Sequence, residues 1–345
     1  MFTCPLLLLT HLILADGATA ETAAPMATER RIEVQGLDRS YLLYAPTAAP
    51  AGPRPLVLVF HGEGGDGRRT EAYFGMNRLA DEAGFLVAYP EGLAAMWDDG
   101  RELPRPPSGG VGLALSLANR LASRRPAEPA PVPDDVVFVR AVVDEVDSLH
   151  PVDRGRVFAT GMSCGGMFCH RLAAEAPDLI AAVAPVAGPV ALPYFDEFRL
   201  GRPVSFFTIQ GDADPIVPIQ GGLVYPAGLQ VRGRISSLEE TLAKYLSATG
   251  IEGRPEVCML EDTARDGTTT ERRAYPPGAE GPRVVVDLVH GGGHGLPGHR
   301  RSHPEWAVGK TSQDYDGSRA IWEFFASCPP RSFTPTGGVV AAAPR

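Results

Sequence analysis

The stretch RVFATGMSCGGMFCHRLA, residues 156–173, decides the fold class. Residues 157–159 are apolar or β-branched and predict a short buried strand, and residues 167–173 predict a helix. Between them, residues 161–165 match the pattern G-x-S-x-G. In a strand-turn-helix context this pattern lifts its serine, here Ser163, out of the sheet edge as a nucleophile. The alternative is an ordinary Gly/Ser turn between a strand and a helix.

Strands and helices alternate along the rest of the chain. Helical spacing of apolar residues occurs within 75–84 and 139–149, from a cap at Ser236 or Ser237 to residue 248, and from Ser312 to residue 325. Apolar runs that predict strands buried on both faces occupy residues 55–60, 85–89, 180–186, 203–209 and 284–289. This alternation predicts an α/β fold, a mostly parallel central sheet with helices on both faces.

A serine hydroxyl needs a base, and the base needs an orienting carboxylate. Asp212 and Asp214 follow the run 203–209, and His294 follows the last run. The order nucleophile, acid, histidine is typical of α/β-hydrolases, and all these residues follow strand ends, where open α/β sheets place their sites. Pro215 stiffens the loop after Asp214 and favours it as the acid, with Asp212 as the alternative.

The oxyanion formed by nucleophilic attack needs two N–H donors. The backbone of Cys164, directly after the nucleophile, is the first candidate. The second is the Glu63 N–H in the segment HGEGG, residues 61–65, which follows a predicted buried strand; an ordinary glycine turn is the alternative there. His61 is interpreted as a packed residue that braces this loop.

Zinc binding is one alternative function, because four histidines lie close together in the sequence: His290, His294, His299 and His303. Against it, Gly, Pro and Arg fill the gaps between these histidines. We therefore predict no metal and no other cofactor. Trp97 and Trp306 are predicted either to line the substrate site or to pack in the core.

Composition limits the remaining function classes. The chain has 345 residues, 44% of them hydrophobic, and a net charge of −9 without a basic block, so nucleic acid is not a predicted partner. The apolar run 5–15 is too short to span a bilayer, and the small residues at 18–20 fit a cleavage site. Residues 1–20 are predicted to be a signal peptide of a secreted or periplasmic protein, although their n-region lacks Lys and Arg.

The predicted organisation is a linker at 21–30, one domain at 31–328 with a Pro-rich insertion at 103–133, and a disordered tail at 329–345. Four cysteines remain after signal removal, at 164, 169, 258 and 328. Cys258 and Cys328 could form a disulfide, whereas Cys164 and Cys169 lie five residues apart on one helix and suit no bridge to each other. The alternative is four reduced thiols.

Taken together, these residues resemble the α/β-hydrolase esterases of the polyhydroxybutyrate depolymerase-like family, relatives of secreted feruloyl and acetylxylan esterases. The matching blocks are HGEGG (61–65), LVAYPEG (86–92), WDDGR (97–101), DDV (134–136), GMSCGGM (161–167), AVAPVAG (182–188), GDADPIVP (211–218), GGGH (291–294) and residues 311–325. The resemblance implies a triad of Ser163, Asp214 and His294, and so supports Asp214 over Asp212.

The resemblance also implies an activity, a secreted serine esterase acting on hydroxyalkanoate oligomers or similar short acyl esters. Two departures bear on the substrate. Cys164 stands where the family usually has Asn, and GLPG at 295–298 stands where it usually has Thr-Trp-Pro-Gly. A feruloyl- or acetylxylan-type carbohydrate esterase is the main alternative. A serine peptidase or a hydrolase-like binding protein with a dead site are further alternatives.

Overall fold

The computed structural model describes residues 26–48, 51–102, 134–225, 231–277, 281–301 and 303–331. The predicted signal peptide 1–20 and insertion 103–133 lie outside the described residues, as do parts of the predicted linker and tail. The predicted linker 21–30 is corrected at its end, because a strand already begins at Thr28 and pairs with the next strand.

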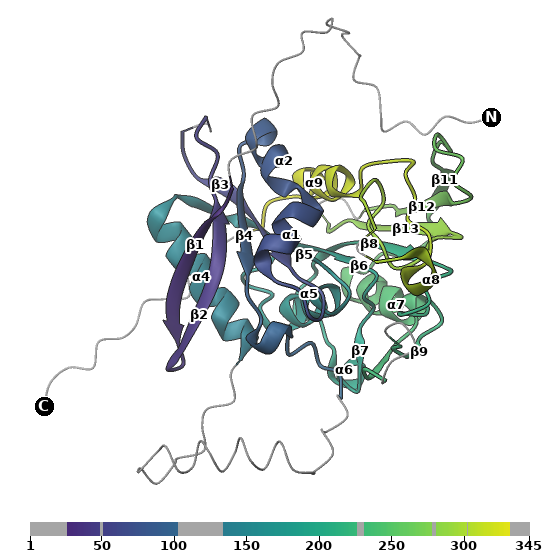
Figure 1. Ribbon diagram of the computed structural model, residues 1–345, viewed down its shortest axis with the longest axis horizontal. Helices are drawn as coiled ribbons and strands as arrows, with labels where there is room; N and C mark the ends of the chain where they lie inside the picture. Colours follow the sequence, from purple (N-terminus) through teal and green to yellow (C-terminus); the bar gives the residue numbers. More distant parts are fainter. Residues whose placement is uncertain are drawn as a thin grey trace, which may run out of the picture.

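One large sheet spans the molecule (Figure 1). Its strands are β1 (Thr28–Val34), β2 (Leu37–Tyr44), β3 (Arg54–Phe60), β4 (Leu86–Pro90), β5 (Val152–Met162), β6 (Ala182–Val186), β8 (Ser205–Gly211), β11 (Glu256–Met259), β12 (Thr269–Tyr275) and β13 (Val284–His290). Their order in space is β1-β2-β4-β3-β5-β6-β8-β13-β12-β11. The strands from β4 to β13 in this order are parallel to one another, while those at both edges pair antiparallel.

Helices cover both faces of this sheet, as α/β folds require. The helices are α1 (Gly67–Phe74), α2 (Met76–Ala83), α4 (Asp135–Leu149), α5 (Cys164–Glu175), α6 (Tyr194–Glu197), α7 (Leu238–Thr249), α8 (Glu305–Val308) and α9 (Gly317–Ser327), with a 3₁₀ turn η1 (Leu93–Ala95). Apolar residues of α4, α5 and α7 share one core cluster, and those of α1, α2 and α9 share another. The predicted fold class is confirmed.

A second, smaller sheet consists of β7 (Ala191–Leu192), β10 (Arg234–Ile235) and β9 (Gly222–Leu223). The sequence did not predict these two-residue strands, nor β11 and β12. The predicted helix 75–84 is α2, but α1 precedes it and ends at Gly75, whose φ of 59° suits a glycine cap. The terminal helix was predicted from Ser312 and instead begins at Gly317, because the Asp316 carboxylate caps it by accepting from the Arg319 N–H.

Helix α5 carries a buried histidine that ties it to its neighbours. His170 is 1% exposed, its Nδ1 lies 2.9 Å from the Tyr245 hydroxyl, and its Nε2 lies 2.9 Å from the Gly188 carbonyl oxygen. The carbonyl can only accept, so Nε2 carries the proton and Nδ1 accepts from the tyrosine. Burial lowers the pKa of His170 to about 4. This imidazole is therefore neutral and structural.

Cys328 does not form the possible disulfide with Cys258. Cys328 is a free, buried thiol that lies 3.3 Å from the Phe324 carbonyl oxygen. Cys164 and Cys169 are free and buried in α5.

Candidate active site

The backbone at Ser163 has the strained geometry of a nucleophile elbow. Ser163 links β5 to α5 with φ 57° and ψ −122°, values that a serine adopts only when its surroundings impose them. Its N–H donates to the Val186 carbonyl oxygen at 2.9 Å. A Cβ on Gly161 would lie 2.7 Å from the Gly165 carbonyl carbon and 2.8 Å from the Phe60 oxygen, so only glycine lets these chains pass. The turn predicted from G-x-S-x-G is present.

Asp214 and His294 form a dry hydrogen-bonded pair. His294 Nδ1 lies 2.7 Å from Asp214 Oδ2, and the two side chains are 10% and 0% exposed. The other carboxylate oxygen of Asp214 accepts from the N–H groups of Ile216 and Val217 at 2.8 and 2.9 Å. A carboxylate so fixed requires the proton on His294 Nδ1, which leaves Nε2 free to accept a proton.

A second acid–histidine pair lies beside the first. His290 Nδ1 lies 2.9 Å from Asp212 Oδ2, and Asp212 Oδ1 accepts from the Gly291 N–H at 2.7 Å. Here the side chains are 39% and 32% exposed. Water therefore screens this pair, and its geometry braces the turn that leaves β13.

Ser163, Asp214 and His294 follow β5, β8 and β13, neighbouring or near-neighbouring parallel strands, at the edge where their carboxyl ends meet. Within the described part of the chain, no hydrogen bond joins the Ser163 hydroxyl to His294. The structure thus joins the acid to the histidine directly and brings the serine to the same edge. Catalytic contacts of this kind often tighten only when substrate is bound.

The predicted oxyanion segment follows β3 and lies against the nucleophile. A Cβ on Gly62 would lie 3.7 Å from Ser163 Cβ. Cys164 is the first residue of α5, so its N–H has no partner within the helix. The Glu63 N–H has no carbonyl acceptor among the described residues. Both predicted amides are thus available beside Ser163.

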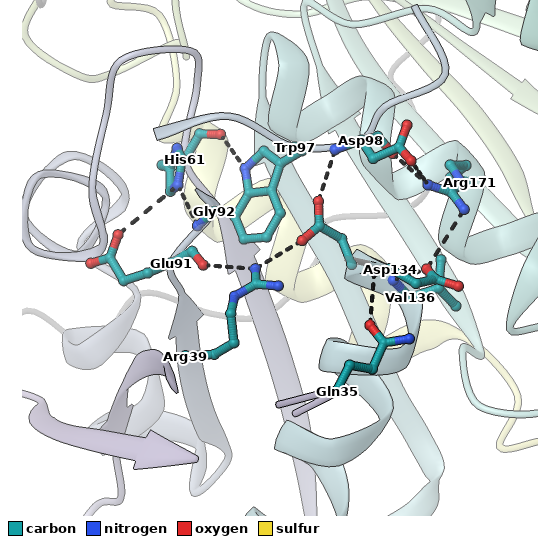
Figure 2. Close-up of polar contacts among 11 residues, drawn as sticks. Gln35, Arg39, His61, Glu91, Gly92, Trp97, Asp98, Asp134, Val136 and Arg171 are labelled. Atoms are coloured by element: carbon teal, nitrogen blue, oxygen red, sulfur yellow. Dashed lines mark hydrogen bonds and ion pairs between the residues drawn. The ribbon is translucent and has the colours of Figure 1, made fainter. Parts of the chain in front are cut away.

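His61 braces this segment, as interpreted from the sequence. Its Nδ1–H donates to the Gly62 carbonyl oxygen at 2.8 Å, and its Nε2 accepts from the Gly92 N–H at 2.9 Å. Burial lowers the pKa of His61, which keeps the ring neutral and able to accept. The indole N–H of Trp97 donates to the His61 carbonyl oxygen at 2.9 Å (Figure 2).

The two tryptophans have different surroundings. Trp97 is 3% exposed and stacks on Phe168 with ring centroids 5.2 Å apart, so the structure favours the core alternative for Trp97. Trp306 is 79% exposed on α8, two residues before Val308, whose carbonyl accepts the His294 N–H. Of the two, only Trp306 presents its indole at the surface near the histidine loop.

Three charged side chains gather around Glu63 and were not identified from the sequence. Arg101 is buried, and its Nη2 lies 2.7 Å from Asp99 Oδ2 and 3.5 Å from Glu63 Oε2. Arg232 Nε lies 2.9 Å from Glu63 Oε1. Residues 99 and 101 come from the WDDGR block, which signals the cluster only through family resemblance. The cluster anchors the Glu63 side chain, and with it the adjacent amide.

A buried ion pair supports the segment behind His61 (Figure 2). Arg39 Nη2 lies 2.8 Å from Asp135 Oδ1, and the Asp135 Oδ2 accepts from the Asp98 N–H at 2.8 Å. Arg171 on α5 donates to the Asp98 carbonyl oxygen at 2.9 Å. These contacts connect strand β2, helix α4 and the nucleophile helix to one loop. No local sequence pattern predicted these contacts.

The thiol next to the nucleophile is enclosed. Cys164 Sγ lies 3.9 Å from the His61 carbonyl oxygen and is fully buried. Burial raises the pKa of the Cys164 thiol well above its usual range. The side chain is therefore a neutral packing group, and its backbone alone faces the site chemistry.

The histidines of the zinc alternative are dispersed. His290 and His294 pair with aspartates, and His299 Nε2 lies 3.2 Å from the Ser318 hydroxyl. Across the described ranges, no three His, Cys, Asp or Glu residues group in a way that could hold a metal ion. Among the same residues, no helix is long and apolar enough to cross a membrane.

Comparison with known proteins places this geometry in context. No protein-family model matches the chain. The chain is 38% identical over 305 residues to the putative esterase NocK of Nocardia uniformis subsp. tsuyamanensis, covering 86% of this chain and 82% of that protein. It is 28% identical over 186 residues to the bifunctional acetylxylan esterase/xylanase XynS20E of Neocallimastix patriciarum, covering 54% of this chain and 23% of that protein.

Two further similarities are more distant. A poly(3-hydroxybutyrate) depolymerase of Ralstonia pickettii is 28% identical over 189 residues, which cover 49% of this chain and 34% of that protein. Among solved structures, an acetyl xylan esterase from Aspergillus awamori superimposes with a TM-score of 0.53 at 15% identity, covering 87% of this chain and 99% of that one. This last likeness concerns the fold.

Proposed function

We propose that this protein cleaves its substrate through an acyl-enzyme on Ser163. The chain belongs to the polyhydroxybutyrate depolymerase-like α/β-hydrolase esterases and is a carboxylic ester hydrolase. The observation that carries the proposal is the dry Asp214–His294 pair, with 2.7 Å between Oδ2 and Nδ1. It leaves the second imidazole nitrogen as a base at the sheet edge that also presents the strained Ser163.

In the proposed mechanism, His294 Nε2 takes the hydroxyl proton as Ser163 Oγ attacks the ester carbonyl carbon. The amides of Cys164 and Glu63 donate to the resulting oxyanion. The tetrahedral intermediate collapses as His294 gives its proton to the leaving alcohol. Water, deprotonated by His294, then attacks the acyl-enzyme, and His294 returns this proton to Ser163 Oγ as the carboxylic acid leaves. Asp214 accepts the hydrogen bond from His294 Nδ1–H and stabilises the imidazolium in both halves.

For the substrate, we propose hydroxyalkanoate oligomers or similar short acyl esters. The family resemblance supports this choice, as does the similarity to the Ralstonia pickettii depolymerase. A feruloyl- or acetylxylan-type carbohydrate esterase is the second candidate, favoured by the similarity to XynS20E and to a probable feruloyl esterase C of Aspergillus flavus, 26% identical over 194 residues. We further propose export of the protein, supported by the signal-like pattern of residues 1–20.

A substrate panel with a serine variant tests the mechanism and the substrate class together. We would measure hydrolysis of nitrophenyl acyl esters, methyl ferulate, acetylated xylo-oligosaccharides and hydroxybutyrate oligomers by the wild type and by Ser163→Ala. We expect turnover of the short esters and oligomers to fall at least about 10³-fold in the variant. Undiminished turnover in a folded Ser163→Ala protein would refute the acyl-enzyme. A strong preference for ferulate or acetylated xylan would favour the second candidate.

A further inference from the structure

Outside the triad, a cavity of about 550 Å³ gathers basic side chains beside the histidine loop. We name it the basic pocket, formed by Arg300, Arg301, His303, Lys310, Thr311 and Gln313 together with two acidic residues described below. The chain as a whole has a net charge of −9, and Lys310 is one of its two lysines. Positive charge concentrated here is therefore a local feature, opposite in sign to the rest of the protein.

Two of the cations in the basic pocket lack a carboxylate partner within the described residues. Among the described residues, Lys310 Nζ donates only to backbone carbonyl oxygens, at 3.2 Å from that of Asp266 and 3.5 Å from that of Gly267. Arg300 is exposed and forms no ion pair with a described residue. By contrast, Arg301 pairs with Glu305. Among the described residues, the pocket thus offers an ammonium and a guanidinium that form no ion pair, although the charge of Lys310 acts on the nearby Asp266 carboxylate.

The acidic group that shares the cavity is already engaged. The carboxylate of Asp266 accepts from the N–H and the hydroxyl of Thr268 at 2.9 and 2.6 Å, and from the Gln313 N–H at 2.8 Å. These bonds hold it as part of the wall. Although burial opposes this, these hydrogen bonds and the nearby Lys310 ammonium lower the pKa of the Asp266 carboxyl, so it keeps its negative charge. Since Arg301 pairs with Glu305, the charges of Arg300, Lys310 and Asp266 leave the basic pocket with a formal charge of about +1, counting histidine as neutral.

An unsatisfied hydroxyl lies in the same wall. Thr311 Oγ1 is buried and has no hydrogen-bond partner among the described residues. A buried hydroxyl without a partner costs about 1–3 kcal/mol, so a ligand oxygen that accepts from it would recover part of this cost. A Cβ on Gly295 would collide with this oxygen, which places the hydroxyl directly against the residue that follows His294.

The wall of the basic pocket is hydrogen-bonded to the loop that carries His294. The Gly293 N–H donates to the Lys310 carbonyl oxygen at 2.7 Å, and the His294 N–H donates to that of Val308. Gly292 and Lys310 also form a parallel β-bridge. The segment 308–311 therefore positions the backbone of His294 and also lines the basic pocket.

We propose that the basic pocket binds a carboxylate group of the ester substrate, so that acidic esters are preferred over neutral ones of equal size. The proposal rests on the esterase function proposed above. A hydroxy-acid oligomer carries one free carboxylate, and hydrolysis of each ester bond creates another. Arginine and lysine N–H groups and the Thr311 hydroxyl are the donors that such a group accepts from. Because the protein is otherwise acidic, a local cation site also offsets the repulsion of an anionic substrate.

Matched pairs of neutral and anionic esters test this inference. On the acyl side, we would compare nitrophenyl hydrogen succinate, glutarate and adipate with nitrophenyl esters of monoacids of equal chain length. On the alcohol side, we would compare 4-acetoxybenzoate with 4-acetoxybenzamide. We expect a KM about fivefold lower for the anionic member in at least one series, the size of a partly exposed ion pair, and a preference that shrinks at high salt.

The variants Arg300→Gln and Lys310→Met should each reduce this preference, and Arg300→Gln should leave kcat for the neutral ester nearly unchanged. Arg300→Gln guards against misfolding, because Arg300 is exposed and forms no side-chain hydrogen bond or ion pair with a described residue. Lys244→Met is the matched control, since Lys244 is the only other lysine of the chain. It lies on α7, over the Phe195 ring of α6. No preference for any anionic ester, or equal loss toward both members of a pair, would overturn the inference. Failure of the esterase proposal is seen separately, as neutral ester turnover that survives Ser163→Ala.

Discussion

Replacing Asp214 with asparagine tests the role of the buried acid. Asparagine keeps the shape, and its carbonyl oxygen can still accept from the N–H groups of Ile216 and Val217. Its amide NH₂ then faces His294 Nδ1. In the wild type, a carboxylate oxygen 2.7 Å from this nitrogen accepts a hydrogen bond from it. The imidazole must turn to the other tautomer, with the proton on Nε2. In that tautomer His294 cannot take the proton of Ser163.

The expected loss follows from that geometry. In most molecules of the variant, His294 is in the tautomer that cannot act as a base. The imidazolium also loses its carboxylate partner, which is 0% exposed in the wild type and therefore poorly screened by water. We expect kcat to fall by about 10⁴, or roughly 5 kcal/mol of transition-state stabilisation. Steady-state hydrolysis of a nitrophenyl ester measures the change, and circular dichroism melting checks that the fold is retained.

Asp212→Asn is the matched control. Asp212 makes the same kind of contact, 2.9 Å to His290 Nδ1, but both partners are more than 30% exposed. An exposed pair of this kind contributes about 0.2–1 kcal/mol, so we expect kcat within about threefold of wild type. Equal losses in the two variants, or more than a tenth of wild-type kcat in Asp214→Asn, would refute the assignment of Asp214 as the acid.

Three further predictions concern the surroundings of the site. Glu63→Gln loosens the anchor to Arg101, and we expect kcat to fall about threefold to tenfold with KM nearly unchanged in steady-state assays; a change in KM alone would contradict this. Gly165→Ala puts a Cβ 2.6 Å from the His61 carbonyl oxygen, so urea denaturation should show a loss above ~3 kcal/mol, and an unchanged midpoint would count against the elbow geometry. His170 has a pKa of about 4 in the folded protein, below its usual 6.5. Between these pH values the unfolded chain binds more protons than the folded one. The free energy of unfolding should therefore fall by about 3 kcal/mol as the pH drops through that window. Melting temperatures measured across that range should fall less in His170→Gln than in wild type.

The sheet centre and the triad order could be predicted because their signals are local. Strands β3, β4 and β6 are buried on both faces and therefore appear as continuous apolar runs. Ser163 lies in a five-residue pattern, and His294 follows the last parallel strand, so both positions follow from chain order alone. The choice between two aspartates two residues apart is different. It depends on which carboxylate is buried, and that is a property of the assembled sheet.

The parts that sequence reasoning missed depend on distant contacts or weak local patterns. β12 reads TTERRAY and lies on the flank of the sheet, where paired charges such as Arg272 and Asp287 replace apolar alternation. The ion pair of Arg39 with Asp135 joins residues 96 positions apart, and nothing near either residue signals the other. Helix α1 has a capping aspartate and a terminal glycine, yet its mixed charged sequence shows little apolar periodicity.

The proposed mechanism requires that Ser163 reacts covalently with the substrate. We would treat the protein with a fluorophosphonate and locate the adduct by mass spectrometry of the tryptic peptide 157–171, in which Ser163 is the only serine. We expect one adduct on Ser163, formed in parallel with the loss of ester hydrolysis, and no adduct in Ser163→Ala. An adduct at another residue that abolishes activity, or full activity with Ser163 modified, would contradict it.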